Sequence, residues 1–177
     1  MTDLGHTDSA ELIRRLTSGD SDRIVEAVRA IAQQGVLEAV PVLLDVLDST
    51  NDGGVWNAIA IALADMGILE AKEHIVALLN DSKTVGNRGS LLYALQQGLD
   101  YRDESPMLTE MCISGNFEVR GEAATMLVAI AGDLTSEERS HVTTKLRQAE
   151  NSELSEFFCE VLEDFEAAAE GVDLEAP

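Results

Sequence analysis

The sequence predicts an all-α protein built as an α-solenoid, a superhelix of antiparallel helix pairs. The first observation is an internal repeat, because the segment GVLEA at 35–39 returns as GILEA at 67–71. The second is that apolar residues on both sides of each copy recur at helical spacing. The third is composition: 45% of the residues are hydrophobic but only 4% are aromatic, which favours helices packed through small aliphatic side chains. In such a repeat each unit buries its apolar face against its neighbours.

Residues 1–20 are expected to form an N-terminal capping helix. Asp8 begins it, and Glu11 stands at the third following position, as in a capping box. The pair Ser18-Gly19 ends the helix before the repeats begin.

Two well-matched repeats follow. In the first, apolar residues from Ile24 onward fall at helical spacing, and Gly35 stops that helix as a C-terminal cap. Pro41 lies near the start of the second helix, where a missing N–H costs little, and residues 48–54 form a polar turn. The second repeat copies this pattern 32 residues later, which places Trp56 in the core. Segment 58–63 alternates in size like a strand, but its alignment with the first repeat predicts a helix.

The rest of the chain is predicted to hold two looser repeats and a final helix. Helices at 87–97 and 105–113 form the third repeat, and the fourth combines 118–130 with a helix opened by a capping box from Thr135 to Glu138. The repeats therefore span 21–150. Residues 151–170 form an acidic amphipathic C-terminal capping helix with three of the four phenylalanines on its apolar face. Residues 171–177 are expected to be a flexible tail.

These repeats resemble the HEAT repeat family in its short form, the phycobilisome-lyase type. The family pattern is a helix ending in Ala-Leu-x-x-x-Gly, then Glu-Ala and a second helix rich in leucine. The matching residues are Ala62-Leu63 with Gly67, Leu69-Glu70-Ala71, Leu78-Leu79, Ala94-Leu95 with Gly98, and Val119-Arg120, with Arg88 matching in part. The resemblance covers about residues 20–150 and is weaker in the last two repeats. The tetratricopeptide and ankyrin signatures are absent.

The resemblance implies that the second helices line the concave side of the solenoid, with a groove edged by acids. Aligning these helices predicts three outward rows: Glu38, Glu70, Asp103 and Glu137; Val42, His74, Met107 and His141; Asp45, Ala77, Glu110 and Thr144. A groove of this kind suits a basic segment or helix of another protein. The candidate partner-binding residues are Glu38, Asp45, Glu70, His74, Asp103, Met107 and Glu110. The alternative is an ordinary solvated face.

The formal net charge is −21, and the last 28 residues contain ten acidic residues and no basic ones. Such a field repels nucleic acids and anionic membrane surfaces and attracts cationic partners. The alternative interpretation is that the acidity serves solubility alone.

No catalytic, metal or cofactor site is predicted. His74 and His141 share a row but lie two repeats apart, roughly 20 Å at the usual helix spacing, so one ion cannot bridge them. The turn at 48–54 resembles a calcium loop until its twelfth position, which is Ile59 instead of Glu. Arg88 and Arg120 are expected to pair with carboxylates or helix ends of the preceding unit. No nucleophile elbow, phosphate loop or zinc-protease helix occurs in the sequence.

The sequence also suggests a location. No apolar run approaches the roughly 18 residues that span a bilayer, and Met1–Ser9 lacks the features of a secretory signal. The two lone cysteines, Cys112 and Cys159, favour a reducing compartment. A cytoplasmic protein is expected.

The leading hypothesis is therefore a non-enzymatic protein-binding scaffold or adaptor that presents an acidic concave surface to a basic partner. One alternative is an inhibitor or immunity-type protein that occludes a basic active site. The other, from the resemblance, is a bilin-lyase-like enzyme. The related hydroxylases use His-Glu pairs, which this sequence lacks, and the net charge opposes a DNA glycosylase. The partner, the organism and the oligomeric state are not encoded in any recognisable motif.

Overall fold

The computed structural model describes residues 8–149 and 154–171, and the regular secondary structure over these residues is helical with no strand. The predicted all-α class is confirmed. Contacts divide the chain into unit 1, Met1–Leu99, and unit 2, Asp100–Pro177. This division falls between the two helices that the sequence groups as the third repeat. The predicted ranges 21–150 and 151–170 stay predictions, and most of the predicted tail lies outside the described residues.

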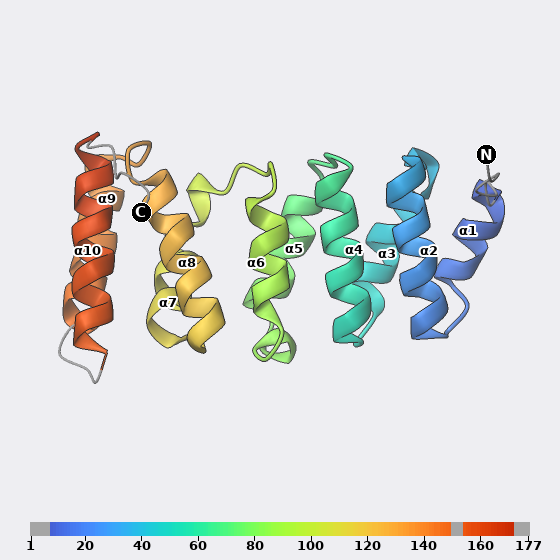
Figure 1. Ribbon diagram of the computed structural model, residues 1–177, viewed down its shortest axis with the longest axis horizontal. Helices are drawn as coiled ribbons and strands as arrows, with labels where there is room; N and C mark the ends of the chain where they lie inside the picture. The colour runs from blue at the N-terminus through green and yellow to red at the C-terminus, as the bar shows by residue number, and fades with distance from the viewer. Residues whose placement is uncertain (1–7, 150–153, 172–177) are drawn as a thin grey trace, which may run out of the picture. The chain divides into compact units, whose positions relative to one another are not determined.

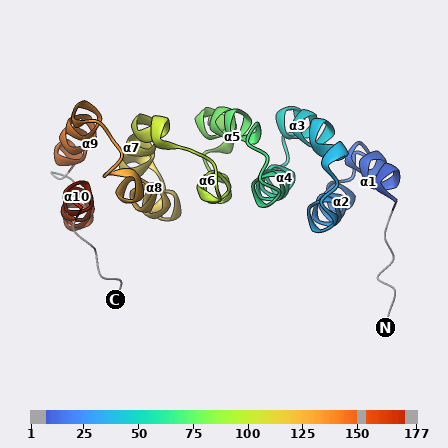
Figure 2. The ribbon, with the colours of Figure 1, turned by 90° about the horizontal axis from the view of Figure 1, so that it is seen from above.

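Over its described residues, 8–99, unit 1 contains six α-helices arranged in two layers. The first helices of the pairs, α2, α4 and α6, pack side by side in chain order, and so do the second helices, α3 and α5. Figure 2 shows these two layers from above. The helix α1 packs against α2 and α3 and covers the N-terminal end of the stack. The helices are α1 Ser9–Leu16, α2 Ser21–Gln34, α3 Val40–Ser49, α4 Gly53–Asp65, α5 Ala71–Asn80 and α6 Arg88–Gln96, with short 3-10 turns at Leu37–Ala39 and Ser82–Thr84 (Figure 1).

The glycine end predicted in unit 1 is observed, and two aspartates that the sequence analysis did not single out cap its first helices. Gly35 and Gly67 adopt φ values of 64° and 70°, a left-handed conformation that suits glycine and turns the chain into the next helix. Asp20 caps α2 by accepting from the Arg23 N–H, and Asp52 caps α4 by accepting from two backbone N–H groups. The two capping aspartates are 32 residues apart, so they follow the same repeat as the glycines.

The core of unit 1 lies between its two layers and is made of aliphatic side chains. Side chains that face inward from both layers are fully buried: Ile31, Leu43, Leu47, Ile59, Leu63, Ile75 and Leu79. Trp56 is buried as predicted, and its indole N–H donates to the Thr50 carbonyl at 2.8 Å. Segment 58–63 is helical, also as predicted.

The described part of unit 2, residues 100–149 and 154–171, contains four α-helices, also in two layers. They are α7 Ser105–Ser114, α8 Phe117–Ile130, α9 Ser136–Ala149 and α10 Ser155–Ala169, and a 3-10 turn lies at Arg102–Glu104. Within this unit α7 contacts α8 and α9, while α10 contacts α8 and α9. The apolar face predicted for α10 is buried through Phe158, Val161, Leu162 and Phe165. Helices α8, α9 and α10 therefore enclose a core that contains Phe158 and Phe165. Both units have the packing of an α-solenoid, in which helix pairs bury one another.

Two local predictions are wrong. Asp8 occupies the cap position of α1 but its side chain makes no capping bond, and the Glu11 carboxylate accepts from Arg14 and Arg15. The polar turn predicted at 48–54 is shorter, since α3 continues to Ser49 and α4 begins at Gly53. The capping box of α9 is confirmed: the Thr135 N–H donates to the Glu138 carboxylate at 2.8 Å, and the Glu138 N–H donates to the Thr135 hydroxyl at 3.3 Å.

Candidate functional site

The second-helix layer of unit 1, defined here as residues 37–49 and 70–80, is strongly acidic. It carries five acidic residues, all exposed, against the single base Lys72: Glu38, Asp45, Asp48, Glu70 and Glu73. The net charge of the layer is therefore −4. Burial explains the orientation, because Leu43 and Leu47 hold one side of α3 in the core and leave Asp45 and Asp48 on the other.

The first-helix layer of unit 1, defined as α2, α4 and α6, is electrically balanced. It carries three acidic and three basic residues: Asp22, Glu26, Asp65, Arg23, Arg29 and Arg88. The same helix pairs therefore present a neutral layer on one side and an acidic layer on the other. A cationic partner is attracted to the acidic side by this difference.

A hollow of about 400 Å³ opens on the acidic layer. Asp48 from α3 and Glu73 and His74 from α5 line it together with Asp81 and Lys83. The His74 Nδ1 lies 2.8 Å from one Asp48 carboxylate oxygen and 3.0 Å from the other, so Asp48 orients the ring. A volume of about 400 Å³ is at the small end of the range for ligand sites and is ample for one side chain.

The two residues at the far side of the hollow are linked to each other. The Lys83 backbone N–H donates to Asp81 at 2.9 Å, and this bond, reinforced by the Lys83 charge, lowers the pKa of the Asp81 carboxyl. The Lys83 ammonium also lies 5.5 Å from the centre of the Trp56 ring. Asp81 is therefore a stable anion at neutral pH, with Lys83 held over the indole.

The predicted site residues divide between the two units. Glu38, Asp45, Glu70 and His74 all belong to the second-helix layer of unit 1, as the alignment predicts. Asp103 lies in the short 3-10 turn of unit 2, and Met107 and Glu110 lie on α7. The role of all seven in partner binding stays a prediction.

The acidic character is not repeated in the second helices of unit 2. Helices α7 and α9 together carry three acids and three bases: Glu110, Glu137, Glu138, Arg139, Lys145 and Arg147. The Lys145 ammonium lies 2.7 Å from the Glu110 carboxylate, which neutralises the predicted row residue. A hollow of about 390 Å³ at Pro106, Glu137 and His141 opens between these helices. Among the second helices, the excess of acidic residues is therefore found in unit 1, whereas in unit 2 the acidic residues concentrate on α10.

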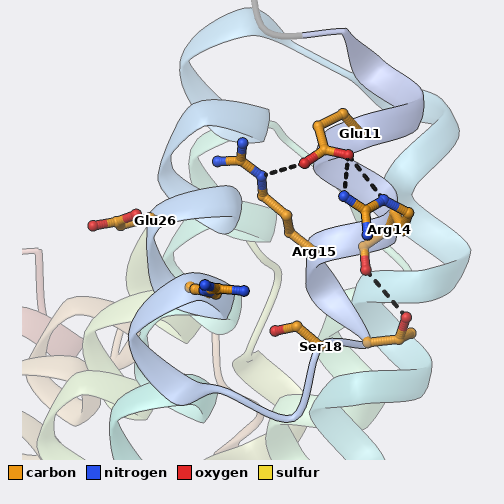
Figure 3. A pocket seen from close by; sticks show the side chains of 7 residues that line it. Glu11, Arg14, Arg15, Ser18 and Glu26 are labelled. Carbon is orange, nitrogen blue, oxygen red and sulfur yellow. Dashed lines mark hydrogen bonds and ion pairs between the residues drawn. The ribbon is translucent and has the colours of Figure 1, made fainter.

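A second hollow of unit 1, about 510 Å³, lies where α1 meets α2 and contains three arginines. Figure 3 shows Arg14 and Arg15 directed at Glu11, while Glu26 points away from them. Arg14 donates to Glu11 at 2.5 Å and Arg15 at 2.9 Å, and these bonds, with that of Arg15 the stronger, lower the pKa of the Glu11 carboxyl. The hollow is therefore neutralised from within, which disfavours it as an anion site.

The predicted role of the repeated arginines is confirmed. Arg88 donates to the Asp81 carbonyl at 3.3 Å, at the end of α5. Arg120 donates to the Cys112 and Gly115 carbonyls at 3.2 and 2.8 Å, at the end of α7. Each arginine therefore donates to backbone carbonyls at the C-terminal end of the preceding helix.

The described residues offer few groups for chemistry. Within 8–149 and 154–171, no group of three or more His, Cys, Asp or Glu side chains is placed to hold a metal ion. Burial raises the pKa of the Cys112 thiol to about 12, so it is protonated at neutral pH. No helix of the described part of the chain is long and apolar enough to cross a membrane.

Sequence comparisons identify no relative, since no family model and no curated protein matches the chain. The solved structures that match include an engineered protein and a designed repeat protein. The crystal structure of an engineered protein is 22% identical, with 94% of this chain and 96% of that one covered, at a TM-score of 0.48. A designed armadillo repeat protein is 15% identical, with 94% and 100% covered, at a TM-score of 0.41. Because both TM-scores are below 0.5, the α-solenoid assignment depends on the helices and contacts of this chain itself.

Proposed function

We propose that this chain is a non-enzymatic protein-binding module whose second-helix layer in unit 1 binds a basic segment of another protein. The observation that carries the proposal is the charge difference between the two layers of unit 1. The second-helix layer, including the residues before its helices, carries −4, whereas the first-helix layer carries zero over its helices, or −2 with the capping residues Asp20 and Asp52. The acidic residues of this layer stand on helices fixed by a fully buried core, so their positions are set before a partner arrives.

The expected mechanism is electrostatic steering followed by local contacts. Opposite charges accelerate encounter and orient the partner, and the effect weakens as salt screens it over about 8 Å at physiological ionic strength. The hollow beside Asp48 and His74 would accept one basic side chain from the partner, because Glu73 and Asp81 line the same space.

The proposal includes two finer assignments. The helix pairs are of the short HEAT-like type, which is supported by Arg88 and Arg120 bonding to the ends of the preceding helices. The protein acts in the cytoplasm, which is supported by Cys112, a buried cysteine that forms no disulfide.

The proposal is tested with a fluorescently labelled lysine-rich peptide, titrated with the protein at low and at high salt. The variant Asp45→Lys with Glu70→Lys changes the charge of the second-helix layer from −4 to zero. We expect its affinity at low salt to fall about tenfold or more, while the helical circular dichroism spectrum is unchanged.

The matched control is Asp22→Lys with Glu26→Lys on α2. Both residues are exposed, and the substitution changes the total charge by the same amount on the other layer. We expect less than about a threefold loss, because the local field at the acidic layer is preserved. An equal loss in both variants would mean that the peptide responds to total charge alone, and the proposed site would be rejected.

A further inference from the structure

Two leucines stand exposed at the same position of neighbouring repeats. Leu37 follows α2 and is 60% exposed, and Leu69 follows α4 and is 70% exposed. Both belong to the segment that first indicates the repeat, and both links lie at the upper edge of unit 1 in Figure 1. Because both side chains are mostly exposed, they contribute little to the core.

Other outward positions have diverged between these two repeats. Arg29 in the first corresponds to Ile61 in the second, and Asp45 corresponds to Ala77. Positions on the solvent side of a helix are therefore not held constant by the fold. An exposed residue that is identical in both repeats needs a specific cause.

The other identical exposed positions have such causes within the fold. Asp20 and Asp52 cap the first helices, and Gly35 and Gly67 take a left-handed conformation. Glu70 is the residue before α5, where a negative charge is favourable near the helix N-terminus, and Glu38 precedes α3 in the same way.

No cause of this kind applies to Leu37 and Leu69. Within this link Val36 and Ala39 are buried in the core, whereas Leu37 between them is exposed to solvent. A single exposed leucine is ordinary on a protein surface, but two at the same position of neighbouring repeats make a candidate interaction surface. The pair is called the leucine ridge below.

We propose that the leucine ridge binds an amphipathic helix of the partner, with basic residues flanking its apolar stripe. This inference rests on the proposed function and specifies the partner of the same unit. Neighbouring helices in a stack are separated by about 8–10 Å, and seven residues of a helix rise about 10.5 Å. The two leucines therefore match two holes one heptad apart on a facing helix, as knobs do in a coiled coil.

Charge defines the rest of the partner helix. Each leucine is followed directly by a glutamate, Glu38 or Glu70, so lysine or arginine beside each hole would pair with it. A second copy of this chain is disfavoured as the occupant, because its net charge of −21 would repel the acidic layer.

The test uses a synthetic amphipathic helix of leucine and lysine with a heptad pattern as the probe. The variant Leu37→Ser with Leu69→Ser should weaken binding about tenfold without changing its dependence on salt, since only apolar contacts are removed. Val85→Ser with Tyr93→Ser is the matched control, because both residues are exposed apolar residues of unit 1 outside the ridge, at 56% and 45%. This control should leave the affinity within about twofold.

A second probe carries proline in the middle of the same peptide, which breaks the helix and should abolish the contribution of the ridge. If the leucine variant binds the helical probe as tightly as wild type, the ridge is rejected. If Asp45→Lys with Glu70→Lys then still abolishes binding, the proposed function survives that failure. If no variant changes binding, both proposals fail. Self-association of the wild type that the leucine variant loses, measured by sedimentation, would also overturn the inference.

Discussion

In unit 1 the two helix layers bury their inner sides in one shared core, but they present different charges to solvent. The first-helix layer has three acids and three bases, whereas the second-helix layer has five acids and one base. Fully buried residues come from both layers, such as Ile59 and Leu63 from α4 and Leu43 and Leu47 from α3. The inner sides are constrained by packing and the outer sides are not, so the outer charge is available for function.

Unit 2 sharpens the comparison because its second helices occupy equivalent places without the same charge. In α9 the bases Arg139, Lys145 and Arg147 outnumber the two acids, and Lys145 neutralises Glu110 of α7. A solenoid therefore does not require acidic second helices. The acidity of the layer in unit 1 is a property of that surface and not of the fold.

The largest expected effect comes from substitutions in the shared core. Leu43→Ala in α3 and Leu63→Ala in α4 each remove a side chain that is 0% exposed. Each should lower the free energy of unfolding by about 2–5 kcal/mol, measured by urea denaturation followed by circular dichroism. Leu37→Ala is the control and should cost less than about 0.5 kcal/mol, because that side chain is 60% exposed. If Leu43→Ala left the free energy of unfolding unchanged, the inner side of α3 would not belong to the shared core.

The next effect concerns charge on the neutral layer. Arg29→Glu with Gln33→Glu, two exposed positions of α2, changes the first-helix layer from zero to −3. We expect a basic peptide to bind about twofold more tightly at low salt through long-range attraction. The stoichiometry, measured by calorimetry, should stay at one peptide per chain, because the hollow at Asp48 and His74 belongs to the other layer. A second bound peptide would show that acidity alone makes a site.

The fold could be predicted from the sequence because it depends on periodicity, which a single chain displays directly. A helix end was predictable where no other side chain competes for the capping residue. Thr135 and Glu138 form the expected capping box of α9. Glu11 forms no capping box, because Arg14 and Arg15 stand three and four residues later and donate to its carboxylate. Both arginines are visible in the sequence, so the competition could have been recognised from i,i+3 and i,i+4 spacing.

The candidate site was less predictable because it depends on neighbours that are distant in sequence. Lys145 is 35 residues from Glu110, and no pattern within α7 reveals that pair. The contact between Asp48 and His74 spans 26 residues and needs α3 and α5 side by side. The repeat that contains Leu37 is evident from sequence, but its exposure is not, since leucine at helical spacing normally indicates the core.

A smaller effect should separate the two capping aspartates of unit 1. Asp52 accepts from the Gly54 and Val55 N–H groups at 2.8 and 3.2 Å and from the Ser21 hydroxyl at 2.7 Å, so it joins α4 to the start of α2. The Asp20 carboxylate makes one capping bond, which it accepts from the Arg23 N–H at 3.2 Å. Asp52→Ala should lower the Tm by about 2–4 °C, and Asp20→Ala by less. Equal shifts, measured by thermal circular dichroism, would show that the bond to Ser21 contributes nothing.

The smallest expected effect is the pH dependence of the same cap. The Ser21 hydroxyl, followed by the backbone N–H groups of Val55 and Gly54, lowers the pKa of Asp52 from its ordinary value of 3.8. Because the pKa is lower in the folded state, the carboxylate contributes its full stability above pH 3.8 and loses it as the pH falls through the folded value. Asp52→Asn keeps a capping side chain without the charge. The difference in urea midpoint between wild type and this variant should therefore be constant near pH 7 and shrink below pH 3.8. A difference that persists unchanged in acid would mean that the cap acts through shape and not through its ionised form.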